Sequence, residues 1–460
     1  MKIRVLCSAV AVALLSGCTS IMQKNDFDSF DSRLLVGDYL GASAVALKHA
    51  GYDKETGKTN DLLWTLQAGA TLNSAGQYEL STKLLDASES FMKKEDTEGT
   101  AKKGVELVGS ILGNDAMLAY EQTHYDGVMG NTIKAWNFIS GNDFSNARVE
   151  LNRAEERQRR AAEYFAALIK ERETEIKVKS GDSALSVSKT MGSNETNNAL
   201  KAAGFEQGKW KHYEGYVNPF TTYSYGLNLM ISGKTKSDYS KAADAFKRVH
   251  SMTGSKTAKA DMELAYRLSK GASQSTLNNQ VWVIFENGQS TVKQERRVDL
   301  PIFLFSDNVA YSGIALPQLK KRGTAFSSIS VDGVNTDTIS DMDQIIGAEF
   351  DTEFPYILAR EVTRVTIKTI AQKQVSDENQ LLGSAIGLLQ LTTTGADIRT
   401  FSALPSEYQA ARLETKNKQV EIKAGPFTLP VELDKNATKH IIYVKAASND
   451  VAPLVKVVNI

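Results

Sequence analysis

The spacing of apolar residues changes once along this 460-residue chain, and the change divides the expected fold in two. Up to about residue 272, small and apolar residues recur at helical spacing, whereas segments after residue 278 alternate large apolar with polar residues. Helical spacing predicts helices that bury one face, and alternation predicts strands. We therefore expect an α+β protein with a helical domain over 30–272 and an α+β domain over 278–460.

Small and aromatic residues in the first part follow the pattern of tetratricopeptide hairpins, in which a Gly turn joins two antiparallel helices. The clearest unit contains Gly69, Gly76, Tyr78 and Leu85. Parts of the same series occur at 37–46, 135–154 and 239–249. Small residues let two helices approach closely, and an aromatic side chain fills the groove of the next helix. This predicts divergent tetratricopeptide-like hairpins, with an irregular helical bundle as the alternative.

Two segments depart from this repeat. Residues 180–204 are rich in Ser and Asn and lack periodicity, so we expect a mobile insertion there. Arg157, Arg159 and Arg160 could bind an anionic partner. A run of mixed charges is, however, more typical of the solvated face of a long helix.

Aromatic residues are concentrated on both sides of Pro219, which we expect to interrupt any helix there. They are Tyr213, Tyr216, Phe220, Tyr223 and Tyr225. Lining a turn, they could form a groove that binds a peptide or glycan partner. The alternative, which we favour, is that they form core at a helix junction.

The second part reads as short strands around one long helix. Residues 280–295 alternate and contain Asn287-Gly288, which is a strong β-hairpin signal. Further strands are expected at 297–306, 325–333, 408–414, 418–425 and 439–446. Residues 342–375 are predicted to form a helix that contains Pro355. We expect an antiparallel sheet with this helix packed across it.

Gly383 and Gly387 form a GxxxG motif in a short apolar run within 381–397. The run is too short to cross a bilayer. It could enter a membrane or mediate self-association through close helix contact, which would give a homo-oligomer. Buried packing within the chain is the alternative.

The N-terminus resembles the signal peptide of bacterial lipoproteins. Lys2 and Arg4 precede an apolar run that is too short to anchor the chain in a bilayer. Leu15-Ser16-Gly17-Cys18 then matches the lipobox of such proteins. The resemblance implies cleavage between Gly17 and Cys18, attachment of a diacylglyceryl group to the Cys18 thiol, and acylation, for example with palmitate, of its new amino group.

Several consequences follow if this is correct. Residues 1–17 are then the signal peptide, and residues 18–29 are a lipidated tether. The alternative is an ordinary secretory signal peptide in which the cysteine occurs by chance. Cys7 leaves with the signal peptide, so the mature chain has no disulfide. Several acyl chains hold a protein firmly at a membrane. Thr19 implies sorting to the outer membrane.

The composition excludes several functions. The 54 Lys and Arg residues balance 54 Asp and Glu residues, which gives no electrostatic footprint for nucleic acid. The five His residues lack the spacing of metal ligands, and the sequence contains no Gly-rich phosphate loop. We therefore expect neither a metal nor a cofactor.

Two weak patterns remain. Ser186 and Lys189 form an S-x-x-K, residues 306–308 read S-D-N, and Lys423-Ala424-Gly425 approximates K-T-G. Together these motifs mark penicillin-binding enzymes, but the spacing is unsuitable here. An acidic group could collect calcium, although acids at a helix N-terminus explain it better. Its members are Asp341, Asp343, Glu349, Asp351 and Glu353.

The lipobox, together with the stretches WNFISGNDFSNARVELNRAEERQ, NPF, VWVIFENG, ADIRTFSALPSEYQAARLE and KHIIYVKA, resembles a group of uncharacterised bacterial lipoproteins with tetratricopeptide-like helices. The resemblance covers most of the mature chain. It implies an outer-membrane protein that accompanies other envelope lipoproteins, including ones that resemble activators of peptidoglycan synthases.

These observations favour a lipid-anchored scaffold or adaptor, without enzymatic activity, that binds envelope proteins in the periplasm. The concave face of the stacked helices is the expected platform, and cell-wall synthesis or an export complex is the expected setting. One alternative is an enzyme that acts on peptidoglycan. The other is an oligomeric export or pore component that uses 381–397.

Overall fold

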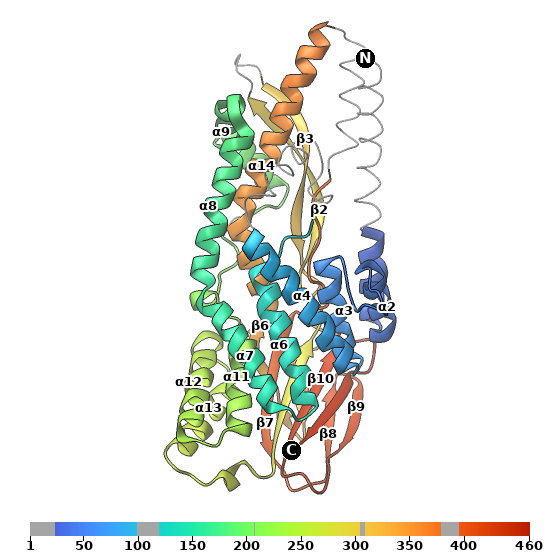
Figure 1. Cartoon of the computed structure of the whole chain (residues 1–460), viewed down its shortest axis with the longest axis vertical. Coiled ribbons are helices and arrows are strands. Elements are labelled where there is room, and N and C mark those ends of the chain that lie inside the picture. The colour runs from blue at the N-terminus through green and yellow to red at the C-terminus, as the bar shows by residue number, and fades with distance from the viewer. Residues whose placement is uncertain (1–23, 99–118, 207, 304–308, 379–394) are drawn as a thin grey trace.

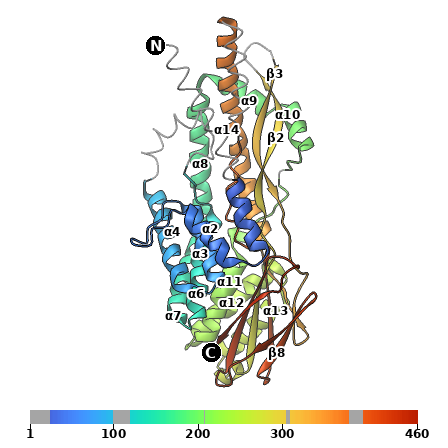
Figure 2. The ribbon, with the colours of Figure 1, turned by 90° about the vertical axis from the view of Figure 1, so that its right-hand side faces the viewer.

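The computed structural model describes residues 24–98, 119–206, 208–303, 309–378 and 395–460. These form an elongated molecule in which helices and two sheets make a body, and an arm extends from it (Figures 1 and 2). The sites predicted at Gly17, Cys18, Gly383 and Gly387 lie outside the described residues. Among the described residues, no helix is both long and apolar enough to cross a membrane.

Helices make up most of the chain before residue 278. Residues 24–35 are helical. The elements that follow are α2 (Tyr39–His49), α3 (Leu62–Ser74), α4 (Tyr78–Glu98), α6 (His124–Ser140), α7 (Phe144–Arg159), α8 (Ala161–Ser180), η2 (Gly181–Ser183), α9 (Ala184–Met191), α10 (Asn194–Ala202), η3 (Glu214–Tyr216), α11 (Pro219–Ser232), α12 (Lys236–Thr253), α13 (Lys256–Ser269) and η4 (Gln274–Leu277).

Consecutive helices pack in pairs, α3 with α4, α6 with α7 and α11 with α12, which confirms a helical repeat-like array. Glycine makes these close approaches possible. A Cβ atom on Gly69 of α3 would lie 2.7 Å from Leu85 Cδ2 of α4. A Cβ atom on Gly226 of α11 would lie 3.1 Å from the Phe246 ring of α12. The small residues in the sequence pattern therefore mark helix contacts.

Two expectations for this part are wrong. Residues 180–204 do not lack regular structure, because they contain α9 and α10, which pack against the strand β2 (Val292–Phe303). Pro219 does not interrupt a helix but begins α11, where the missing N–H costs nothing. The side chain of Asn218 caps this helix by accepting a hydrogen bond from Phe220 N at 3.0 Å.

Strands and one long helix make up the second part, so the α+β prediction is confirmed. The elements are β1 (Gln280–Asn287), β2 (Val292–Phe303), β3 (Val309–Lys320), β4 (Ser330–Val331), β5 (Val334–Asn335), β6 (Asp337–Asp341), α14 (Met342–Glu378), β7 (Glu407–Glu414), β8 (Gln419–Ala424), β9 (Phe427–Glu432), β10 (Lys439–Ala446) and β11 (Leu454–Asn459).

The strands form three sheets. The largest has the order β11-β10-β1-β7-β6, and β1 and β10 are parallel in it, so this sheet is mixed and not purely antiparallel as expected. The second sheet is β5-β4-β8-β9, and the third is the antiparallel pair β2-β3.

The predicted hairpin at Asn287-Gly288 is wrong, since β1 pairs with β10 and β7 while β2 pairs with β3. Asn287 instead binds a distant loop, and its Oδ1 accepts hydrogen bonds from the backbone N–H groups of Ala325 and Phe326 at 2.9 and 3.1 Å. A Cβ atom on Gly288 would lie 2.1 Å from Gly323 O. The glycine is needed for this backbone approach and not for a two-residue turn.

The five-stranded sheet is covered on both faces. Alternate residues of β1 point to opposite faces. Trp282 and Ile284 belong to the core shared with the helices, while Val281, Val283 and Phe285 pack toward the four-stranded sheet. The segments 30–272 and 278–460, predicted as separate domains, therefore share one hydrophobic core.

The arm consists of α8, α9, α10, α14 and the β2-β3 pair (Figures 1 and 2). Its own core combines Leu300 of β2, Leu316 of β3 and Phe354 of α14. The helix α14 packs mainly on α8, α9 and β3, so it does not cross the five-stranded sheet as predicted. Pro355 lies in its interior.

Candidate functional site

The predicted aromatic groove is wrong for two of its five residues. Phe220 is buried and stacks on Tyr408 of β7, with ring centroids 3.6 Å apart. Tyr223 is also buried and donates a hydrogen bond to Asp261 at 2.6 Å. Both belong to the core, as the alternative interpretation expected. Tyr225 is half-buried at its edge.

The two remaining tyrosines lie beside and within η3, where Tyr213 contacts the residue before α14 and Tyr216 packs on α8. The hydroxyl of Tyr213 accepts a hydrogen bond from Asp341 N at 3.1 Å, and burial raises the pKa of Tyr213 to about 12. The ring of Tyr216 lies against His212 and Phe165, with centroids 4.3 Å away in both cases. The structure therefore does not gather the five aromatic side chains on one accessible surface.

The inner faces of the helices, expected to bind partners, are covered by the five-stranded sheet. The ring of Trp136 on α6 lies 4.8 Å from that of Tyr443 on β10, and Phe220 on α11 stacks on β7. Helix α13 also contacts β7. The concave platform predicted from the repeats is thus occupied by the chain itself.

A buried ion pair fastens the helices to this sheet. Asp261 of α13 lies 2.7 Å from Arg412 Nε of β7 and accepts a hydrogen bond from Trp282 Nε1 at 3.2 Å. Tyr223 donates a further bond to it. Burial raises the pKa of Asp261, and the charge of Arg412 opposes this rise. The Asp261 carboxylate thus has partners from three other elements, which favours a structural role for this network.

The penicillin-binding pattern is not assembled. Ser186 is buried in α9, whereas Lys423 lies in β8 and pairs with Glu421 at 3.0 Å. The helix α9 and the strand β8 lie at opposite ends of the molecule (Figures 1 and 2). Residues 306–308 lie outside the described residues.

The acidic residues considered for calcium, which the sequence better explained as acids at a helix N-terminus, are spread over the end of β6 and the first turns of α14. Asp343 accepts hydrogen bonds from Thr291 N and Ser406 Oγ at 2.6 and 2.8 Å. Asp351 accepts one from Trp210 N at 3.1 Å. The other acids have separate surroundings: Asp341 caps Gln344 N at 2.9 Å, Glu349 binds the start of α6, and Glu353 faces a pocket. Within the described ranges no three His, Cys, Asp or Glu side chains could hold a metal ion.

The three arginines in the last turn of α7 and directly after it bind residues of this chain. Arg157 donates a hydrogen bond to Asn131 at 3.0 Å. Arg159 pairs with Glu156 at 2.6 Å and Arg160 with Glu163 at 3.3 Å. The last two are exposed pairs at i,i+3 spacing, as expected of a solvated helix face.

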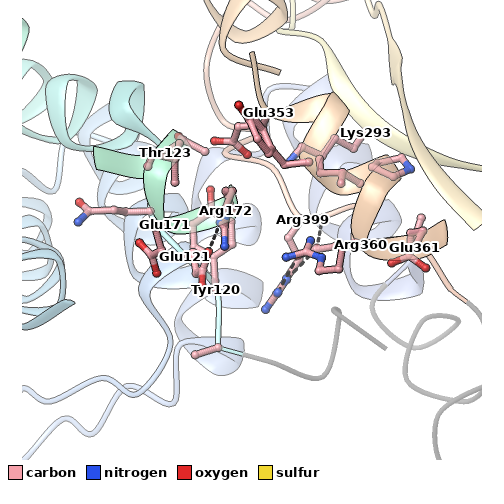
Figure 3. A pocket seen from close by; sticks show the side chains of 18 of the residues that line it. Tyr120, Glu121, Thr123, Glu171, Arg172, Lys293, Glu353, Arg360, Glu361 and Arg399 are labelled. Carbon is pink, nitrogen blue, oxygen red and sulfur yellow. Dashed lines mark hydrogen bonds and ion pairs between the residues drawn. The ribbon is translucent and has the colours of Figure 1, made fainter. Parts of the chain in front are cut away.

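A pocket of about 300 Å³ lies between the arm and the start of α6 (Figure 3). Five parts of the chain line it: residues 119–123, α8, the β2-β3 pair, α14 and residues 396–399. Nine charged side chains reach its wall, namely Glu121, Glu171, Arg172, Lys293, Glu353, Arg360, Glu361, Asp397 and Arg399. Apolar and aromatic side chains lie between them, including Leu168, Ile357 and Tyr356.

The charged side chains occupy two sides of the pocket. Glu121, Glu171 and Arg172 lie on one side, and Arg360, Glu361 and Arg399 on the other (Figure 3). Arg172 pairs with Glu121.

Arg399 is fixed by Asp397 through two hydrogen bonds, Nε to Oδ1 at 2.9 Å and Nη2 to Oδ2 at 2.7 Å. Burial raises the pKa of Asp397, but the charge of Arg399 and its hydrogen bonds, together with the charge of Lys293, lower that pKa overall.

Two buried acids, one on α6 and one on α14, bind the segment that lines the pocket or follows it. Asp126 of α6 accepts hydrogen bonds from the Tyr120 hydroxyl at 2.7 Å and from Thr123 N at 2.8 Å, and both partners line the pocket. Burial raises the pKa of Asp126 to about 6. Glu349 of α14 accepts bonds from His124 N and Tyr125 N at 2.5 and 3.3 Å. Burial also raises the pKa of Glu349 well above its usual value.

Sequence reasoning missed this pocket because no single segment of the chain carries its signal. The run that contains Glu171 and Arg172 reads as a solvated helix face, and only the fold brings it opposite Arg360 and Arg399. Comparison of the chain with models of protein families, with curated proteins and with solved structures found no match.

Proposed function

We propose that this chain is a lipid-anchored scaffold or adaptor of the bacterial cell envelope. Acyl chains on Cys18 hold it at the outer membrane, facing the periplasm, where it binds other envelope proteins. The lipobox-like stretch and the resemblance to tetratricopeptide-like lipoproteins support this proposal. Confinement to a surface raises the effective concentration of its partners, which suits the assembly or regulation of cell-wall synthesis or of an export complex.

The arm is the observation that carries this proposal. The sheet covers the inner helix faces, which leaves the arm as the element that extends away from the body (Figure 1). Its apolar core and the length of α14 make it a stiff projection. Tyr311 on β3 is 73% exposed, and exposed aromatic side chains are enriched in protein interfaces. We place the partner-binding surface on the arm.

Site-specific photocrosslinking in cells tests this assignment. A photoreactive residue replaces Tyr311 on the arm or, as a matched control, Tyr266 on α13, which is 56% exposed on the body. We expect position 311 to capture defined envelope proteins that position 266 does not. Equal capture at both positions, or none at 311, would overturn the assignment of the arm.

The lipid anchor is tested separately. Cys18→Ser removes the thiol that the lipid requires, so we expect the protein to lose acylation and leave the membrane fraction or accumulate as an uncleaved precursor. Cys7→Ser changes the other cysteine and is expected to leave both unchanged. Mass spectrometry of the N-terminal peptide and cell fractionation measure the outcome. Normal acylation of the Cys18→Ser variant would refute the anchor.

A further inference from the structure

Exposed apolar side chains gather near the start of the described part of the chain. Among the described residues, eight large apolar side chains are exposed, and three of them fall within six positions: Leu35, Val36 and Leu40, which are 44%, 58% and 61% exposed. The other five lie singly on α7, α9, α13, β3 and β5. Single exposed apolar residues are normal, whereas a group of them marks an interaction surface.

The helix α2 is apolar on both of its faces. Its inner face belongs to the core shared with the sheet, through Tyr39, Ala42 and Ala46. Leu40, Ala44 and Leu47 follow one another at helical spacing on the other face, where Ala44 is exposed and Leu47 is half-buried. We call these three residues the outer row. Residues 39–47 contain no charged side chain, and a helix that is apolar all round is normally covered on both sides.

The first hairpin, which consists of helix 24–35 and α2, forms one end of the helical array. α2 packs on α3 and lies at the edge of the body in Figure 1, on the side that faces the viewer in Figure 2. The terminal unit of a helical array normally presents a polar outer face to solvent. The outer row and the adjoining Leu35 and Val36 do not suit that role, so we expect another surface to cover them.

The tether identifies that surface. Five residues separate Cys18 from Lys24, and a chain of that length spans at most about 20 Å. The helix that begins at residue 24 is fixed to the body, because the ring of Phe27 stacks on Trp64 of α3 with centroids 4.8 Å apart. This helix is about 18 Å long. Acyl chains on Cys18 would therefore hold the first hairpin next to the bilayer, and the tether is long enough to reach along the helix to the turn before α2.

Contact with lipid would leave no charge on this surface without a partner. The hydroxyl of Ser43 donates a hydrogen bond to Leu40 O at 2.7 Å. Arg33 and Asp38 form an ion pair of 2.7 Å at the turn, and both are partly exposed. A Cβ atom on Gly41 would lie 2.4 Å from Arg33 Nη1, so the guanidinium flanks the outer row. It can reach the phosphate layer while the apolar side chains enter lipid.

We propose that the first hairpin lies against the lipid bilayer that holds Cys18, with the outer row, Leu35 and Val36 at the boundary between headgroups and acyl chains. The inference rests on the proposed lipid anchor and adds a second membrane contact to it. A lipid chain alone leaves a protein free to turn about its tether. Because the hairpin is fixed to the body, this contact sets the orientation of the whole molecule, including the arm, relative to the membrane.

Quenching by spin-labelled lipid tests the proposal on the acylated full mature lipoprotein in phosphatidylethanolamine–phosphatidylglycerol vesicles. Ala44→Cys places a fluorophore on the outer row, and Lys259→Cys, exposed on α13, is the matched control. Side chains at the headgroup boundary lie about 5–10 Å deep, so we expect the labelled lipid to quench position 44 about twofold and to leave position 259 unchanged. Leu40→Glu, combined with Ala44→Cys, is expected to abolish this quenching, whereas Tyr266→Glu on α13 is expected to preserve it. Circular dichroism of each variant confirms that it is folded.

The possible outcomes are distinct. An acylated protein that stays with the vesicles but is quenched equally, or not at all, at positions 44 and 259 would overturn the inference and leave the anchor standing. Quenching at position 44 that survives Leu40→Glu would also overturn it, because the outer row would not make the contact. Shielding of position 44 from a water-soluble quencher without quenching by lipid would overturn it in favour of a second copy or another protein. Mass spectrometry of the N-terminal peptide reports on the anchor itself, and a protein without acylation would refute both.

Discussion

Asp261 illustrates how single residues join the two parts of this molecule. Its carboxylate is fully buried and binds side chains from α11, β1 and β7, so one group fixes three elements relative to α13. Breaking a buried ion pair by removing one partner leaves a buried charge without compensation. Removing one partner of this buried pair is therefore expected to lower the free energy of unfolding more than removing one partner of an exposed ion pair.

Arg412→Ala tests this directly. We expect the free energy of unfolding to fall by about 3–5 kcal/mol because Asp261 loses its cation. Arg296→Ala, on the exposed side of β2, is the control and is expected to change it by no more than about 0.5 kcal/mol. Urea unfolding followed by circular dichroism measures both. A loss below about 1 kcal/mol for Arg412→Ala would show that the pair does not hold the sheet.

Asp126 predicts a pH dependence. Its pKa is about 6 in the folded protein against 3.8 for an ordinary Asp, because burial favours the protonated form. The folded state thus binds this proton more tightly, by about 3 kcal/mol. This stabilisation is complete below pH 3.8 and is lost as the pH rises through about 6. Stability should therefore decrease between about pH 4 and pH 7.

Asp126→Asn removes the titrating group, so the decrease in stability over this range should become smaller. Glu349, whose pKa is also raised, has a contribution of the same sign and leaves a residual slope. Unfolding free energies of both proteins at several pH values provide the measurement. Identical slopes for the two proteins would contradict the assignment to Asp126.

At the scale of elements, the effect of replacing a helix glycine depends on how closely it faces a side chain of the neighbouring helix. Gly69→Ala places a Cβ atom 2.7 Å from Leu85, so we expect a loss of about 1–3 kcal/mol through overpacking. Gly130→Ala, in the interior of α6, meets Leu66 at an ordinary 3.5 Å. It is expected to stabilise the helix by roughly 0.5–1 kcal/mol. Opposite shifts of the thermal midpoint would confirm the distinction, and equal shifts would refute it.

Sequence patterns predicted helices and strands correctly where the local spacing of apolar residues determines the element, and failed where a tertiary contact determines it. The strand at 439–446 and the helix that begins at 342 were placed correctly from alternation and helical spacing. The hairpin at Asn287-Gly288 was wrong because both residues serve a tertiary contact with the loop around 323–326. The pocket could not be predicted, since its five segments meet only in the folded chain.

At the scale of the whole molecule, the shared core makes the two predicted domains interdependent. Trp282, Tyr408 and Ile441 of the sheet belong to the same core as the helices. Exposing this surface would leave a large apolar patch on either part, which promotes aggregation.

We therefore expect residues 24–277, produced alone, to be insoluble or to lack fixed tertiary structure. Co-production with 278–460 should restore a soluble complex with the near-ultraviolet circular dichroism of the intact protein. A monomeric, cooperatively unfolding 24–277 fragment would contradict this expectation and would support two separate domains.

The order of strands in the five-stranded sheet also determines how late in synthesis the sheet can form. The parallel neighbour of β1 is β10, which is made about 150 residues later. At ordinary rates of translation this delay lasts roughly eight to thirty seconds. During that time the helices that cover the sheet can pack on β1 but not yet on β10 or β11. The nascent chain therefore exposes apolar surface of its unfinished core, which can associate with other molecules, until almost its last residues have been made.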